Sequence, residues 1–122
     1  MNKYTGLSEF EINLKVAHIM LGKDSYDWCT DKKEVYLAGI DGGDFLPHGY
    51  FDPCNNPADA MPIIIDNNIS LRAPTITDRW KAEFIDEYGN YVGYRRAMNK
   101  NPLRAAMELF LLMKDAENSN GN

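Results

Sequence analysis

"NPLRAAMELFLLMKD", residues 101–115, predicts a helix with apolar side chains around much of its circumference. Asn101 before Pro102 is typical of a helix start, because asparagine caps a free backbone N–H and proline suits the first helical position. Apolar side chains then recur at helical spacing and form a wide face: Leu103, Ala106, Met107, Leu109, Phe110, Leu111, Leu112 and Met113. We therefore expect this helix to be buried against both a sheet and another helix.

A helix is also predicted near the beginning of the chain, over residues 8–21. Ser8 and Glu11 have the spacing of a capping box, in which each side chain satisfies a backbone N–H of the other residue. Apolar residues continue on two neighbouring stripes, so this helix too should be largely buried. We expect Gly22 to end it in the left-handed conformation that glycine adopts readily.

Residues 50–59, "YFDPCNNPAD", contain a second cap-and-proline start at Asn56-Pro57. Pro62 lies five residues after Pro57 and should interrupt the helix, because an interior proline lacks a backbone donor and crowds the preceding turn. The sequence therefore predicts a single turn at the start and a separate helix from Pro62 to about Asn67.

Alternating apolar residues and turn residues predict the remaining elements as strands and loops. Residues 41–53 contain three glycines and two prolines, so we expect them to form a long irregular loop. The expected strands lie at 34–40 and 69–76, and a hairpin lies within 79–98 with its turn at Gly89-Asn90.

The order of these elements predicts a small α+β domain. We expect three helices packed on one face of an antiparallel sheet of three to four strands. This single domain would cover residues 1–115, and the polar residues 116–122 would form a disordered C-terminal tail.

Composition narrows the classes of function. The 122 residues carry a net charge of −5, which opposes binding to nucleic acid and permits a basic protein partner. Apolar runs are too short to cross a membrane, and the N-terminus does not resemble a signal peptide. Cys29 and Cys54 are too few for a disulfide framework, so we expect free thiols and a cytoplasmic location.

Several motifs together resemble one family. "FDPCNNPADAMPIIIDNNISL", the tryptophan of "RWKAEF" and "NPLRAAMELFLLMKD" are similar to the NinX-type proteins of lambdoid phages and prophages, as is "LSEFEINLKVA" near the N-terminus. The resemblance covers roughly residues 6–114. Many members have Gly-Gly where this chain has Ala60-Met61. The resemblance implies an accessory gene of a phage or prophage, and it implies no activity.

The loop from Asp41 to Cys54 also contains Asp44, His48 and Asp52, which are chemically active side chains. Their spacing matches no established metal-ligand pattern, and aspartates are common in solvated turns. We therefore expect no metal and no cofactor. Cys54 precedes a helix start that could lower the pKa of its thiol. His48 could then act as the base that activates this thiol. A small enzyme using this loop therefore stays an alternative.

Asp52 and Asn55 are the candidates for ligand binding in this loop. Asn56, Pro57 and Asp59 are explained as the start of a helix, whereas Asp52 and Asn55 are not. Both could fix the backbone of their own loop, or both could point at a ligand beside the helix start.

Two residues outside this loop complete the candidate ligand site. Trp80 could pack in the core or could form a stacking platform for a base. Arg104 lies in the first turn of the last helix, where the helix dipole disfavours a cation. It could contribute to a pocket, or it could form a salt bridge with Asp59 or Glu108.

Tyrosines and arginines gather on the predicted hairpin, and exposed side chains of these types are typical of protein interfaces. This candidate interface comprises Tyr88, Tyr91, Tyr94, Arg95 and Arg96. The wide apolar terminal helix also permits a homodimer.

We interpret the chain as a phage or prophage accessory protein that binds and modulates a host or phage protein without catalysis. The alternative is a small-molecule binder that counteracts host defence by binding a nucleotide signal, with Asp52, Asn55, Trp80 and Arg104 in its pocket. Neither interpretation includes a nucleic acid or a membrane as partner.

Overall fold

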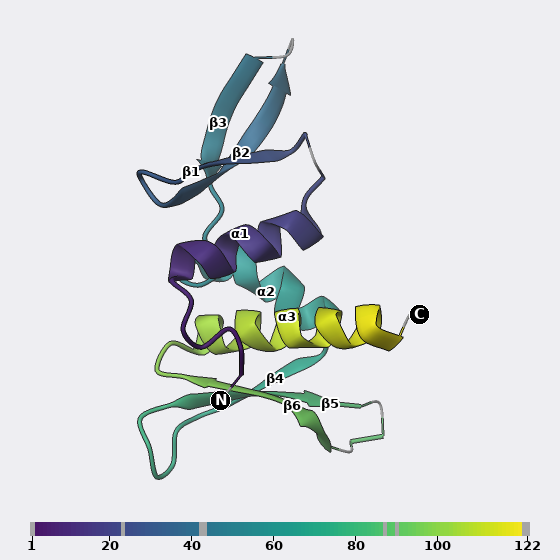
Figure 1. Ribbon diagram of the computed structural model, residues 1–122. Helices are drawn as coiled ribbons and strands as arrows, with labels where there is room; N and C mark the ends of the chain where they lie inside the picture. Colours follow the sequence, from purple (N-terminus) through teal and green to yellow (C-terminus); the bar gives the residue numbers. More distant parts are fainter. Residues whose placement is uncertain (1, 23, 42–43, 87, 90, 121–122) are drawn as a thin grey trace.

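The computed structural model describes residues 2–22, 24–41, 44–86, 88–89 and 91–120, with side chains described outside 38–48, 91–95 and 119–120. Helices and strands alternate along these residues (Figure 1). The helices are α1 (Glu9–Met20), α2 (Pro57–Asp66) and α3 (Pro102–Asn120). The strands are β1 (Tyr26–Cys29), β2 (Glu34–Asp41), β3 (Asp44–Tyr50), β4 (Ile69–Arg72), β5 (Trp80–Ile85) and β6 (Tyr91–Asn99).

The fold is α+β, but the expected arrangement of all helices on one sheet is not found. The strands form two separate antiparallel sheets, ordered β1-β2-β3 and β4-β5-β6. Figure 1 shows the helices between them, with α1 facing the first sheet and α3 lying on the second. The second sheet contains the predicted hairpin. The first sheet contains the strand predicted at 34–40, now β2, together with β1 and β3, which were not predicted as strands.

Helix α3 forms the centre of the hydrophobic core. It contacts all three strands of the second sheet on one side, and α1 and α2 on the other, as its wide apolar face predicts. Ala105, Ala106, Met107, Leu109 and Phe110 are fully buried. The helix continues to Asn120, into the segment that was predicted as a tail.

The predicted start of α1 is confirmed. Ser8 Oγ accepts a hydrogen bond from Glu11 N at 3.1 Å, and Glu11 Oε1 accepts one from Ser8 N at 3.0 Å. The end of α1 differs from the prediction, because Leu21 is the C-cap in an extended conformation with φ −109°. The Leu21 N–H still bonds to Ala17 O at 2.9 Å, so a left-handed Gly22 is not required.

Helix α2 runs through Pro62 without a break, where a turn and a separate helix were predicted. Pro62 is exposed, while Ile63 and Ile64 are buried beside it. Burial of each isoleucine stabilises the helix by about 1.5–3 kcal/mol, which offsets the roughly 3 kcal/mol that an interior proline costs. The helix ends at Asp66 with Asn67 as its C-cap, and Asn68 has the left-handed φ of 55°.

The predicted loop at 41–53 instead contains β3, and the polar residues before β2 contain β1. Pro47 pairs with Ala38 in β3, which is an edge strand of its sheet. An edge strand tolerates proline because one of its sides has no strand to bond with. A register shift between Tyr36 and Ala38 and a φ of 130° at Gly49 accommodate the irregular sequence.

Candidate functional site

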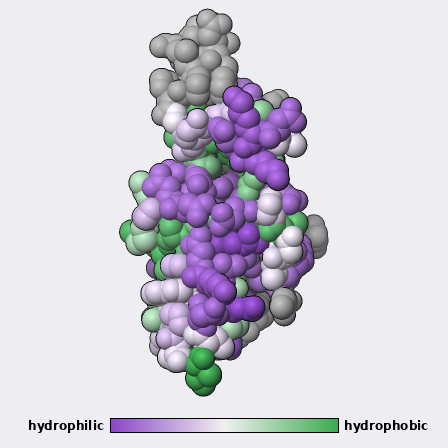
Figure 2. Space-filling model, turned by 90° about the vertical axis from the view of Figure 1, so that its left-hand side faces the viewer, coloured by the Kyte–Doolittle hydropathy of each residue, from purple (hydrophilic) through white to green (hydrophobic). Residues whose placement is uncertain are grey.

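A cleft with a volume of about 420 Å³ opens between the first half of α1, the start of β2 and the loop after β3. Glu9 and Asn13 of α1, Glu34 of β2, and Asp52 and Asn55 of the loop all line it. The volume is in the range of small-molecule sites. Figure 2 views the side of the molecule on which α1 begins, and hydrophilic residues dominate this face.

The loop that carries Asp52 is shaped by the start of α2. Asp52 O accepts hydrogen bonds from Asn55 N at 3.0 Å and from Asn56 N at 2.7 Å, while Asp52 N donates to Asp59 Oδ2 at 2.9 Å. Asn56 Oδ1 caps the helix by accepting from Ala58 N at 3.0 Å. The predicted structural roles of Asn56 and Asp59 are therefore confirmed.

Side-chain amides connect the carboxylates of the cleft. Asn13 Nδ2 donates to Asp52 Oδ1 at 2.7 Å. Asn55 Nδ2 donates both to Asp52 Oδ1 at 3.2 Å and to Glu9 Oε1 at 3.1 Å. From α3, Asn101 Nδ2 lies 3.5 Å from Glu9 Oε2 and donates to Cys54 O at 2.6 Å. Asp52 and Asn55 are thus brought together in the cleft, where both also hold the surrounding elements in place.

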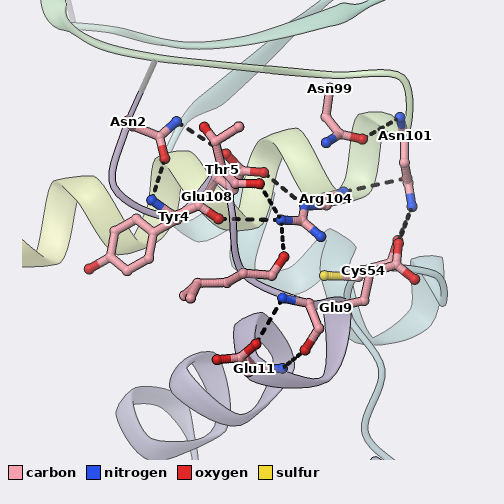
Figure 3. A network of polar contacts seen from close by, with 12 residues as sticks. Asn2, Tyr4, Thr5, Glu9, Glu11, Cys54, Asn99, Asn101, Arg104 and Glu108 are labelled. Carbon is pink, nitrogen blue, oxygen red and sulfur yellow. Dashed lines mark hydrogen bonds and ion pairs between the residues drawn. The ribbon is translucent and has the colours of Figure 1, made fainter.

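Arg104 does not line the cleft, because its guanidinium is occupied in the protein interior. Arg104 Nε donates to Glu108 Oε2 at 2.8 Å, which is the predicted i,i+4 pair. Its terminal nitrogen donates to the carbonyl of Leu7 at 2.6 Å and to those of Tyr4 and Thr5 at 3.3 Å (Figure 3). Arg104 therefore fixes the N-terminal segment to α3.

Trp80 also lies away from the cleft. It is half-buried at the start of β5, opposite Asn99, in the sheet on the far side of α3 (Figure 1). The four candidate ligand residues consequently occupy different places: Asp52 and Asn55 share one cleft, and Trp80 and Arg104 lie elsewhere.

Cys54 is fully buried, with its backbone N donating to Asn13 Oδ1 at 3.1 Å. Burial raises the pKa of its thiol well above the usual range, and the nearby carboxylate of Glu9 raises that pKa further. A thiol in this state is a poor nucleophile. The side chains of Asp41, Asp44 and His48 lie outside the described residues, and the described part of the chain holds no group of three metal-ligating side chains.

A cluster of apolar and aromatic side chains lies at the end of α1 and on β1, and all but the half-buried Tyr26 are exposed. We call it the aromatic patch, and it comprises His18, Ile19, Met20, Tyr26 and Trp28. Ile19 is 45% exposed, Met20 40% and Trp28 43%. No sequence signal pointed to this patch, because β1 was not predicted and two of the patch residues belong to that strand.

The three rings of the patch contact one another. Tyr26 and Trp28 stack with ring centroids 6.1 Å apart, and the imidazole of His18 lies edge-on to both. The Tyr26 hydroxyl is also hydrogen-bonded to His18 Nδ1. Aromatic pairs in such geometries stabilise each other, so the three rings support one another's positions.

The structure describes only part of the candidate interface on the hairpin. Tyr88 is 80% exposed beside the turn, where Gly89 has a φ of 81°. The side chains of Tyr91, Tyr94 and Arg95 lie outside the described residues, and Arg96 is exposed. This surface stays a prediction.

Comparison with known proteins identifies the family. The family model described as "Bacteriophage P22, NinX" matches residues 3–114, and the chain belongs to this family of phage proteins. No curated protein and no solved structure gave a match to the chain. Among the described residues, no helix combines the length and the apolar character that a membrane crossing requires.

Proposed function

We propose that this NinX-family protein is a non-enzymatic accessory protein that binds a host or phage protein in the cytoplasm of the bacterial host. The observation that carries the proposal is the aromatic patch. Single exposed apolar residues are ordinary on protein surfaces, whereas a contiguous group of them is typical of a contact site. Tryptophan, tyrosine and methionine are also enriched in the centres of protein interfaces.

The contacts among the rings of the patch favour binding. Because the rings of His18, Tyr26 and Trp28 already contact one another, little side-chain freedom would be lost when a partner covers them. Trp28 would act as the main anchor, since large aromatic side chains dominate interface energies.

The charge of the surroundings selects the partner class. Asp24 is exposed two residues before Tyr26, and the whole chain carries a net charge of −5. Charge complementarity favours a partner that presents an apolar anchor surrounded by basic residues.

The test is a pull-down from phage-infected cells, with affinity measurement on the captured protein. Trp28→Ala should weaken binding about 30-fold, as expected for an interface anchor. Ile19→Ser should weaken it as well. Ile76→Ser is the matched control, because Ile76 is 96% exposed and lies in the segment between β4 and β5.

Binding that survives Trp28→Ala and Ile19→Ser would contradict the assignment of this surface. Loss of binding with Tyr88→Ala alone would place the interface on the hairpin instead. Circular dichroism of each variant checks that it is folded, so that a loss of binding is not caused by unfolding.

Small-molecule binding is the second candidate, and the cleft is the observation that favours it. A nucleotide is a poor occupant, since the carboxylates of Glu9, Glu34 and Asp52 line the cleft and Lys33 is the counter-charge among its lining residues. Phosphate groups would be repelled by this surplus of negative charge. Catalysis by Cys54 has little support, because its buried thiol stays protonated.

A further inference from the structure

The charges in the cleft are out of balance. Glu9, Glu34 and Asp52 contribute carboxylates, and Lys33 contributes an ammonium group from an exposed position beside β2. Glu9 and Asp52 are half-buried. Partial burial weakens solvent screening, so the field of these carboxylates inside the cleft is stronger than it would be on an open surface.

One amide nitrogen holds two of these carboxylates close together. Asn55 Nδ2 donates at 3.1 Å to Glu9 and at 3.2 Å to Asp52, so two negative charges share a single neutral donor. Within the described part of the chain neither residue forms an ion pair, so only neutral amides bind these two charges. A cation entering the cleft would remove the repulsion between them.

The carboxylates of Glu9 and Asp52 can both accept further hydrogen bonds. An ionised carboxylate accepts up to about four hydrogen bonds. The described donors to Asp52 are the amides of Asn13 and Asn55, and those to Glu9 are the amides of Asn55 and Asn101. Hydrogen bonds from a charged donor are roughly twice as strong as those from a neutral amide.

Aromatic side chains complete the lining. Phe10, Tyr50 and Phe51 border the cleft, and Tyr50 is 62% exposed. The ring of Tyr50 is held against that of Tyr36, with centroids 5.5 Å apart. An aromatic ring beside carboxylates suits an organic cation, because the ring face attracts the charge and covers the attached carbon atoms.

From this combination we propose that the cleft binds an organic cation, a group with a guanidinium or a primary ammonium. The charged nitrogens bond to Glu9 and Asp52, and the aliphatic portion lies against the aromatic lining. This site uses none of the residues of the aromatic patch, so its test is independent of the protein-binding function proposed above.

The experiment monitors the side-chain amide signals of Asn13 and Asn55 by ¹⁵N NMR during titration. The probes are N-acetylarginine amide and its neutral isostere N-acetylcitrulline amide. We expect saturable shifts of these two amides with the arginine probe and none with the citrulline probe. Equal shifts with both probes, or no saturation with any cation, would overturn the proposal.

Conservative variants locate the site. Glu9→Gln and Asp52→Asn should each weaken the arginine probe about tenfold, because each removes one charge from a charge-assisted contact. Asp66→Asn changes the net charge equally at an exposed position outside the cleft and should leave binding unchanged. If Asp52→Asn disturbs the loop, Glu9→Gln alone still tests the site, and unaltered binding by that variant contradicts it.

Two further probes distinguish the source of the cation. Tighter binding of spermidine would assign the cleft to free polyamines. Tighter binding of acetyl-Gly-Arg-Gly-amide would assign it to an arginine side chain of a protein. Both results support a cation site, whereas saturable binding of inorganic phosphate at the same amides would refute it.

Discussion

Arg104 shows how a residue that conflicts with local preference is explained by distant partners. A cation in the first turn of a helix is disfavoured by the helix dipole. Here the carboxylate of Glu108 and three carbonyls of the N-terminal segment surround the guanidinium, and Glu108 also accepts from Asn2 Nδ2 at 3.1 Å. From the sequence, Glu108 could be predicted as a partner because it lies one helical turn after Arg104. The carbonyl partners could not be predicted, because they lie about 100 residues earlier in the chain.

We predict that Arg104→Met lowers the free energy of unfolding by about 3–5 kcal/mol, because Glu108 would remain as a buried charge without a cation. Urea unfolding monitored by circular dichroism measures this change. Lys114→Met is the control, since it breaks the partly exposed pair with Glu117 and should cost less than about 1 kcal/mol. Equal effects of the two substitutions would show that the Arg104 pair has no special structural role.

Cys54 is predicted to be inert in the folded protein. Burial raises the pKa of its thiol, so the reactive thiolate is scarce at neutral pH and only increases as the pH rises toward that raised pKa. Iodoacetamide at pH 8 should therefore modify Cys29, which is partly exposed, and leave Cys54 unmodified until urea is added. Mass spectrometry after proteolysis distinguishes the two. Rapid modification of Cys54 in the native protein would contradict this prediction and would support a reactive thiol at this position.

The candidate site was predictable from sequence only in part. Asn56 and Asp59 follow local rules of helix capping, which act within a few residues. Asp52 and Asn55 could be identified as unexplained by those rules, and the cleft contains both. Glu9 and Asn13 could not be connected with them, because that contact depends on how α1 packs against the loop.

At the level of elements, the strands of the first sheet were the hardest to predict. β1 has four residues and β3 contains proline and glycine, so neither has a strong local signal. Both are edge strands that exist through pairing with β2. The stronger periodic elements, α1, α3 and the β5–β6 hairpin, were predicted correctly because their patterns are longer.

The first sheet should also be less stable against local opening than the rest of the molecule. It contacts the remaining elements chiefly through the packing of β2 on α1, whereas α3 contacts the second sheet and both other helices. We predict that backbone amides of β1 exchange with solvent at least tenfold faster than those of Met107 to Leu111 in α3. Hydrogen exchange monitored by NMR measures this ratio, and equal protection would indicate that both sheets unfold as one unit.

At the scale of the whole molecule, two sheets enclose the helices, and the first sheet creates both surfaces of interest. The first sheet lines the cleft together with the beginning of α1, and it forms the aromatic patch together with the end of α1. The sequence predicted an α+β fold with three helices, but it did not predict a second sheet. Consequently it could not predict surfaces that arise between that sheet and α1.

The most direct test of the proposed protein-binding function is site-specific photo-crosslinking in phage-infected cells. Benzoylphenylalanine is placed at Met20 in the patch or at Ile76 as the control, because both positions are exposed. We predict one dominant crosslinked protein from position 20, none from position 76, and loss of the adduct when Trp28→Ala is added. The same adduct from both positions, or an adduct that persists with Trp28→Ala, would contradict a specific interface at the aromatic patch.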